Sequence, residues 1–459
     1  MDMTSSRRKS ITKTSGVPAL DGLKRYHTIP NFKLGGTYSP GDESGFEYGG
    51  TGGVTLESLG AEPLRVAYIA VGNPERDREG KITNAVIVSP YYSGDSTFMY
   101  YYWHDGQEGN GFALGPVIGP GKLIDTDKYY VIFLDAVGLW GASKPSNGLG
   151  MKFPAYNYCD CVQANYRLLV DQLNIGRIKL ATGVSMGAIQ SYIWAVLHPE
   201  FVEAILPIGG LTEINSNTRW LFELMTAAIQ SDPLWRETKG DYYHLPKEKH
   251  PNQGVMFGWS ILLYTGLSFD FRVGQPWAET CKEVFCWKPD GKQGELLLPL
   301  AHNYDANDLL LRNRLGDGYF LTDQLHRIRA KTLILHVAND QWLRLSYNSP
   351  QKLDSTIRCM LACRYRKEVR HGTKHAQESR RRLQGESGLG GDSGRENHGP
   401  DRHRVRCSPQ PNPPVAAEAS CRAAAALFGS TQKRREGRRR TAGRTLSPDR
   451  AAQGGTGLA

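Results

Sequence analysis

Long apolar runs are missing from this 459-residue sequence. No stretch of eighteen apolar residues occurs, which argues against a transmembrane helix, and no apolar segment follows the basic residues 7–9 to complete a secretory signal. The eight cysteines include no CxxC pair of the kind that binds zinc, and a domain of this size needs no disulfide framework. We therefore expect free thiols, no metal, no cofactor, no membrane binding and a cytoplasmic location.

Excess positive charge is also absent from most of the chain. The net charge is +10, but residues 358–459 alone hold 22 of the 56 basic and 9 of the 46 acidic residues. The remainder therefore carries 34 basic and 37 acidic residues and all nine tryptophans. The sequence predicts an aromatic-rich globular body followed by a basic, disordered tail. Basic tails attract phosphate backbones, but a solvated tail without a nucleic-acid partner is the interpretation that we favour.

Apolar segments at regular spacing predict the fold. Buried strands are expected at 64–70, 84–88, 129–134, 178–182, 204–208 and 332–337, with helices at 158–173 and 188–198 between them. Strands that alternate with helices are typical of a doubly wound, mostly parallel α/β sheet. Between about 211 and 325 the strand signals fade and helices are expected at 221–229, 255–267 and 307–314. We interpret this segment as a helical cap over the carboxyl edge of the sheet.

The strongest candidate site is the G-x-S-x-G sequence at residues 183–187, between an expected strand and an expected helix. This arrangement is a nucleophile elbow, in which a sharp turn exposes the serine, here Ser185, at a helix N-terminus. Chance alone would supply on the order of 0.3 such matches in a chain with this many glycines. A glycine-rich turn with an exposed serine is thus the competing interpretation, and the strand, the helix and the order of the partners favour the functional one.

A serine nucleophile needs a base, an acid that orients the base, and an oxyanion hole. Asp340 follows a late strand and fits the acid, although an ordinary Asn-Asp turn would explain it too. The oxyanion hole should use the N–H of Met186 and one N–H from the loop at residues 91–93, which follows the expected strand at 84–88. Histidines after Asp340 occur only in the tail. His371 has a plausible spacing, but no apolar strand precedes it to hold the ring.

Several further motifs occur in a fixed order along the chain. They are Asn84 to Val88 with Tyr92 to Asp95, Gly119 to Asp127, Gly183 to Gly187 with Trp194 to Pro199, Ala228 to Trp235, and Tyr304 to Asn307. With these motifs, residues 64–343 resemble the homoserine O-acetyltransferase branch of the α/β-hydrolase fold. The resemblance implies Ser185 as nucleophile, Asp340 as triad acid, and Tyr92 and Met186 as oxyanion amides. It also implies an acyl-CoA donor, a hydroxyl amino acid acceptor and a homodimer packed through the cap.

Two departures from the family pattern bear on the activity. The family's arginine, which would pair with a substrate carboxylate, is replaced by Thr226, and this weakens the case for an amino-acid acceptor and favours a hydrolase. The family's C-terminal Gly-His is not recognisable. Three functions remain open: a serine hydrolase with an esterase-like activity on a small acyl substrate, an O-acetyltransferase that uses acetyl-CoA as co-substrate, and a catalytically dead protein without a triad histidine.

The expected organisation has three parts. Residues 1–35 form a flexible arm, residues 36–357 form the α/β-hydrolase domain with its cap, and residues 358–459 form the tail. We hypothesise that the tail is a frame-shifted or mis-spliced end that replaces the last strand, the histidine loop and the final helix. A nucleotide sequence that encodes neither Gly-His nor an apolar helix in its other frames beyond Ile357 would contradict this hypothesis.

Overall fold

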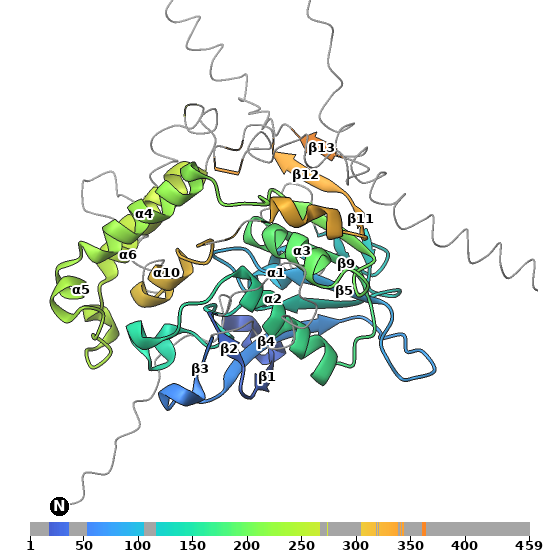
Figure 1. The fold of residues 1–459 in the computed structure, drawn as a ribbon, viewed down its shortest axis with the longest axis horizontal. Helices are drawn as coiled ribbons and strands as arrows, with labels where there is room; N and C mark the ends of the chain where they lie inside the picture. Colours follow the sequence, from blue (N-terminus) through green and yellow to red (C-terminus); the bar gives the residue numbers. More distant parts are fainter. Residues whose placement is uncertain are drawn as a thin grey trace, which may run out of the picture.

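A nine-stranded sheet forms the centre of the protein in the computed structural model (Figure 1). The structure describes residues 18–35, 53–104, 116–266, 273, 304–317, 319, 321–337, 340, 342–343 and 360–363. The strand order is β1-β4-β8-β5-β9-β10-β12-β13, with β11 paired to β10 beside this path. Strand β4 runs antiparallel to both of its neighbours, β1 and β8, and the other strand pairs of the path are parallel. The expected doubly wound, mostly parallel sheet is confirmed.

The strands lie close to where the apolar runs predicted them. The strands of the main sheet are β1 (Arg25–Ile29), β4 (Leu64–Val71), β5 (Ala85–Ser89), β8 (Tyr130–Leu134), β9 (Ile178–Val184), β10 (Ala204–Ile208), β11 (Lys331–Thr332), β12 (Ile334–Val337) and β13 (Met360–Cys363). Two short pairs lie apart from it, formed by β2 (Lys33–Leu34) with β3 (Val54–Thr55) and by β6 (Ile118–Gly119) with β7 (Ile124–Asp125). All five residues of β5 are buried, as a strand covered on both faces requires.

Two apolar layers, one on each side of the sheet, explain that burial. Ala85 and Ile87 of β5 pack in a large cluster with helices α2 (Tyr158–Arg167) and α3 (Met186–Leu197). The alternate residues Val86 and Val88 pack in a second cluster with α1 (Ser96–Trp103). Side chains of a strand point alternately to opposite faces, so helices cover both faces of the sheet. The predicted helix at 158–173 is present, and its second half is a π-helical turn, η6 (Leu168–Gln172).

The segment predicted to be a cap is helical where the structure describes it. Its helices are α4 (Ser216–Gln230), α5 (Pro233–Thr238), α6 (Asn252–Gly266) and α10 (Ala306–Arg312), and short 3-10 helices occur at η7 (Lys247–Lys249) and η9 (Thr322–Arg327). Helices α4 and α6 lie side by side at the edge of the molecule, and α10 lies between them and the sheet (Figure 1). The remaining 3-10 helices are η1 (Pro18–Leu23), η3 (Glu57–Leu59), η4 (Pro145–Asn147) and η5 (Gly150–Lys152).

Two expectations about the ends of the domain are corrected. Within the predicted flexible arm, residues 18–35 are docked, because β1 pairs with β4 and Phe32 and Leu34 are buried. The sequence of β1 does not indicate a strand, because β1 is an edge strand in which only Ile29 is buried. At the other end, β13 pairs with β12 inside the segment predicted to be tail. The sheet therefore continues past Ile357, through the short apolar run at 360–363.

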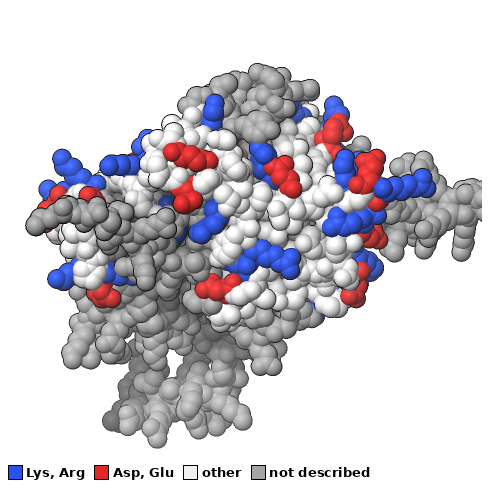
Figure 2. All heavy atoms as spheres, turned by 90° about the horizontal axis from the view of Figure 1, so that it is seen from below, with Lys and Arg blue, Asp and Glu red and all other residues white. Residues whose placement is uncertain are grey.

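Charged side chains of both signs are interspersed on the described part of the face in Figure 2. Opposite charges also pair on the described surface: Lys179 lies 2.6 Å from Glu203, and Arg219 lies 2.7 Å from Asp317. This distribution agrees with the near-neutral charge of the body. None of the described helices is long and apolar enough to cross a membrane.

Candidate active site

Ser185 occupies a strained turn between β9 and α3. Its backbone has φ 55° and ψ −116°, a conformation that a residue with a side chain adopts only when its surroundings enforce it, at a cost of about 1–3 kcal/mol. The Ser185 N–H donates to the carbonyl of Ile208 at 2.9 Å, and the Ser185 carbonyl accepts from Ala188 and Ile189 at the start of the helix. The residue is half-buried, and its hydroxyl does not cap the helix. This is the backbone geometry that the nucleophile-elbow hypothesis requires.

The two flanking glycines permit close contact between the strand, the helix and β5. A β-carbon on Gly187 would lie 2.3 Å from the carbonyl oxygen of Ser89, and one on Gly183 would lie 2.7 Å from the Cα of Gly187. Any side chain at either position would force the helix away from the sheet. The competing interpretation of a surface glycine turn is therefore less favoured, because both glycines are buried at a three-element junction.

The loop between β5 and α1 faces this elbow, and the carbonyls of its residues 90–93 all accept hydrogen bonds. The carbonyl of Pro90 accepts from the Gln190 amide at 3.2 Å, and that of Tyr91 accepts from the N–H of Gly94 at 3.1 Å. The carbonyls of Tyr92 and Ser93 accept from two side chains of the cap, the Arg312 guanidinium at 3.0 Å and the Tyr304 hydroxyl at 3.1 Å. We name residues 90–93 the oxyanion loop.

Among the described residues, no acceptor engages the N–H groups that are predicted to form the oxyanion hole. Within the described residues, neither the Tyr92 N–H nor the Met186 N–H donates to any acceptor. Met186 is the first residue of α3, where an N–H has no partner inside the helix. Both residues are nearly fully buried, with 4% and 3% of their surfaces exposed. Two unused, buried donors beside a strained serine are what a developing oxyanion would bind.

Asp340 lies beyond the carboxyl end of β12, two strands away from the nucleophile strand β9. Its Oδ1 accepts from the N–H groups of Trp342 and Leu343, both at 2.8 Å, and the residue is half-buried. These bonds form the Asx turn that the sequence also suggested. The turn holds the carboxylate on this loop, and its role as triad acid stays a prediction.

The triad base is not placed by the structure. His371 lies outside the described residues, beyond β13. No histidine within the described ranges is hydrogen-bonded to the Ser185 hydroxyl. His336 on β12 is buried and contacts the carbonyl of Gly210 at 3.0 Å, and burial lowers its pKa. His198 lies at the opposite end of α3, where burial lowers its pKa to about 3.

Several contacts around the oxyanion loop are not predictable from the sequence. Asn313 accepts from the Tyr92 hydroxyl at 2.5 Å and donates to the Thr226 hydroxyl at 3.0 Å. Thr226 thus belongs to a neutral hydrogen-bond chain that links α4 to the oxyanion loop. Arg312 and Asn313 follow an apolar run of leucines on α10. In the sequence, Arg312 is recognisable only as a charged residue at the end of this apolar run. That position does not indicate which groups its side chain contacts.

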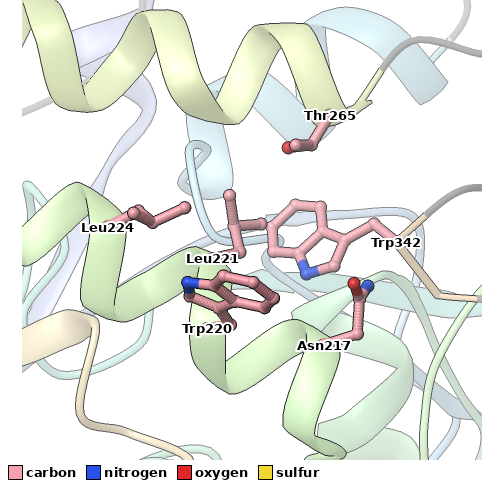
Figure 3. A pocket seen from close by; sticks show the side chains of 6 residues that line it. All are labelled: Asn217, Trp220, Leu221, Leu224, Thr265 and Trp342. Atoms are coloured by element: carbon pink, nitrogen blue, oxygen red, sulfur yellow. The ribbon is translucent and has the colours of Figure 1, made fainter.

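A pocket of about 290 Å³ opens beside this region (Figure 3). Its lining comes from α4, the end of α6 and the turn after Asp340, and comprises Asn217, Trp220, Leu221, Leu224, Thr265 and Trp342. Leu221 points toward the indole of Trp342 in Figure 3. The ring of Phe222 contacts the rings of both Trp342 and Tyr92, with centroid distances of 5.7 and 5.6 Å. Aromatic contacts therefore connect the pocket lining to the oxyanion loop.

Comparisons with known proteins agree with this geometry. No family model matches the chain. In structure, the chain is similar to an acetylester hydrolase from Corynebacterium glutamicum, with a TM-score of 0.58 and 21% identity over 76% of this chain and 90% of that one. The sheet order, the elbow and this similarity define an α/β-hydrolase fold.

The sequence relatives are acyltransferases and esterases. The chain is 27% identical to a homoserine O-acetyltransferase from Desulfotalea psychrophila over 62% of this chain and 75% of that protein. It is 29% identical to an ethyl acetate hydrolase from Pseudomonas veronii over 66% of this chain and 83% of that protein. It spans only 60 to 64% of three further homoserine O-acetyltransferases. The protein is thus an α/β hydrolase or acyltransferase that resembles the homoserine O-acetyltransferase family.

Proposed function

We propose that the protein is a serine hydrolase that cleaves small acyl esters through an acyl-enzyme on Ser185. The observation that carries the proposal is the strained, half-buried Ser185 beside the N–H groups of two buried residues, which have no acceptor among the described residues. Strain at a single non-glycine residue persists when the surrounding structure maintains it, and such residues cluster at active sites.

The reaction has two steps. The Ser185 Oγ attacks the acyl carbonyl and loses its proton to the base, and the negative charge formed on the carbonyl oxygen is bound by the N–H groups of Tyr92 and Met186. The tetrahedral intermediate collapses when the alcohol leaves with that proton. Water then attacks the acyl-enzyme by the same route and releases the acid. Asp340 orients the base, for which His371 is the candidate.

The competing activity is acetyl transfer from acetyl-CoA to a hydroxyl acceptor such as homoserine. Both activities share the first step and differ in whether water or an alcohol resolves the acyl-enzyme. The homoserine O-acetyltransferases among the relatives favour transfer. Thr226 favours hydrolysis, because its hydroxyl is engaged with Asn313 and supplies no positive charge for a carboxylate. A protein with no functional base would perform neither reaction.

Partners and location follow from the same reasoning. We include in the proposal a small-molecule acyl substrate, no bound metal or cofactor and no nucleic-acid partner. A homodimer is proposed from the family resemblance. A cytoplasmic location is proposed from the cysteines, of which Cys159 and Cys161 are free thiols.

A fluorophosphonate probe tests the nucleophile. The wild-type chain should be labelled on Ser185, Ser185→Ala should not be labelled, and a matched control, Ser231→Ala on the exposed surface, should be labelled as the wild type is. No labelling of the wild type would refute both enzymatic functions and leave the catalytically dead protein. Release of acetate from ethyl acetate without an alcohol acceptor supports hydrolysis, whereas acetyl-CoA consumption that requires homoserine supports transfer.

A further inference from the structure

Two consecutive residues at the end of α10 hold Tyr92 at both ends. Arg312 donates to the backbone carbonyl of Tyr92 at 3.0 Å, and Asn313 accepts from the Tyr92 hydroxyl at 2.5 Å. The Arg312 guanidinium also lies over the Tyr92 ring, 5.4 Å from its centroid. Tyr92 cannot rotate or shift without breaking contacts to the cap.

Arg312 joins the cap to a second loop at the edge of the sheet. Its other Nη donates to the carbonyl of Gly138, in the turn that follows β8. Arg312 is only 4% exposed and forms no salt bridge within the described part of the chain. Burying an arginine without a carboxylate is costly, so the two carbonyl bonds must compensate for much of its lost hydration. A fold rarely retains such a group unless the geometry that it imposes matters.

We propose that Arg312 and Asn313 are positioning residues that set the Tyr92 N–H in the oxyanion hole and so couple the cap to catalysis. This inference rests on the proposed role of Tyr92. A guanidinium can bind two carbonyls at once because its N–H groups form a planar fork, and a lysine ammonium in the same place lacks this geometry. Loss of the guanidinium would free the Tyr92 carbonyl. The peptide groups on either side of Tyr92 could then rotate, and the Tyr92 N–H would turn away from the reacting oxygen.

The expected signature is selective for the transition state. A donor aimed at the oxyanion contributes little to binding of the ester and much to the rate, because the negative charge exists only during the reaction. Deleting one oxyanion donor lowers kcat about 10²- to 10³-fold, and displacing it should cost somewhat less. We therefore expect Arg312→Met to lower kcat for p-nitrophenyl acetate about 10- to 100-fold with KM within about twofold.

The variant series separates geometry from charge and from stability. Arg312→Lys keeps the charge and should recover no more than about threefold of the lost kcat, whereas Asn313→Ala should give a smaller kcat loss of the same kind. The control is Arg314→Met, which removes an exposed arginine two residues away and should behave as the wild type. If Arg312→Met does not fold, Arg312→Lys and Asn313→Ala carry the test. Full activity in Arg312→Lys, or equal changes in kcat and KM, would overturn the proposal.

Hydrogen–deuterium exchange provides a readout that does not need activity. The amide of Gly94, which closes the oxyanion loop by donating to the Tyr91 carbonyl, should exchange at least about tenfold faster in Arg312→Met, while the amides of β5 keep wild-type rates. If the wild type is not labelled by fluorophosphonate, the proposed function fails, and this exchange measurement alone decides whether α10 positions the loop. Unchanged exchange of the Gly94 amide would refute the positioning role in either case.

Discussion

Lys24 forms a buried ion triad whose disruption should be measurable as a large loss of stability. Its Nζ lies 2.7 Å from Asp95 and 2.8 Å from Asp135, and all three side chains have no exposed surface. Burial alone would lower the pKa of Lys24, but the charges of Asp135 and Asp95 outweigh it and raise that pKa. The carboxylates also anchor α1, because Asp95 caps its first turn and Asp135 accepts from the N–H of Ser96. The triad thereby joins the N-terminal segment to the start of α1 and the end of β8.

Lys24→Met removes the cation and leaves two carboxylates side by side in the core. Removing one member of a buried ion pair costs about 3–5 kcal/mol, because the remaining charge is uncompensated. With an m-value of about 3 kcal/mol/M, the urea midpoint should fall by about 1 M or more. The matched control is Lys128→Met, which breaks an ion pair of the same 2.7 Å length at a lysine that is 61% exposed. The control should leave the midpoint nearly unchanged.

The cost should depend on pH in a defined direction. In Lys24→Met one buried carboxyl group will have a folded-state pKa above its unfolded value, so its protonated form stabilises the fold. That contribution is present below pH 4 and is lost as the pH rises through the folded pKa. The difference from wild type should thus be larger at pH 8 than at pH 5. Asp135→Asn in the Lys24→Met background should recover part of the stability, because one carboxylate is removed. A pH-independent difference, or a shift no larger than that of Lys128→Met, would refute the reasoning.

Three further perturbations test the packing around the site and the cap. Gly187→Ala should destabilise the fold by about 1–3 kcal/mol or more, because the added β-carbon would lie 2.3 Å from a backbone carbonyl oxygen. The control is Gly22→Ala, whose β-carbon enters open space, and equal urea midpoints for the two variants would contradict this prediction. Burial, and to a smaller extent the neighbouring carboxylate of Asp308, raise the pKa of Asp305 to about 6. The wild type should therefore lose stability relative to Asp305→Asn as the pH rises from about 4 to 6. Parallel profiles of unfolding free energy against pH would contradict this prediction. Burial raises the pKa of Cys159 to about 12 and raises the pKa of Cys161 as well. Ellman's reagent at pH 8 should therefore modify neither thiol before the protein unfolds. Peptide mapping of the treated protein would verify this.

Local sequence determined the parts of the protein that depend on near neighbours. The apolar run at 84–88 specified a strand buried on both faces, and β5 is buried at all five positions. The glycines at 183 and 187 specified the elbow, because no other residue allows that approach between strand and helix. Charge counts separated the near-neutral body from the basic tail. Each of these inferences needed only composition or a pattern within about ten residues.

Tertiary structure decided the features that depend on distant residues. Edge strand β1 lacks an apolar pattern and is recognised only by its pairing with β4. Arg312 is 220 positions from Tyr92, and no periodicity links the end of a cap helix to the carbonyl that it binds. Lys24, Asp95 and Asp135 likewise meet only because η1, α1 and β8 converge. Elements that are distant in sequence become neighbours through the order of the strands, and a single sequence does not specify which polar groups then face each other.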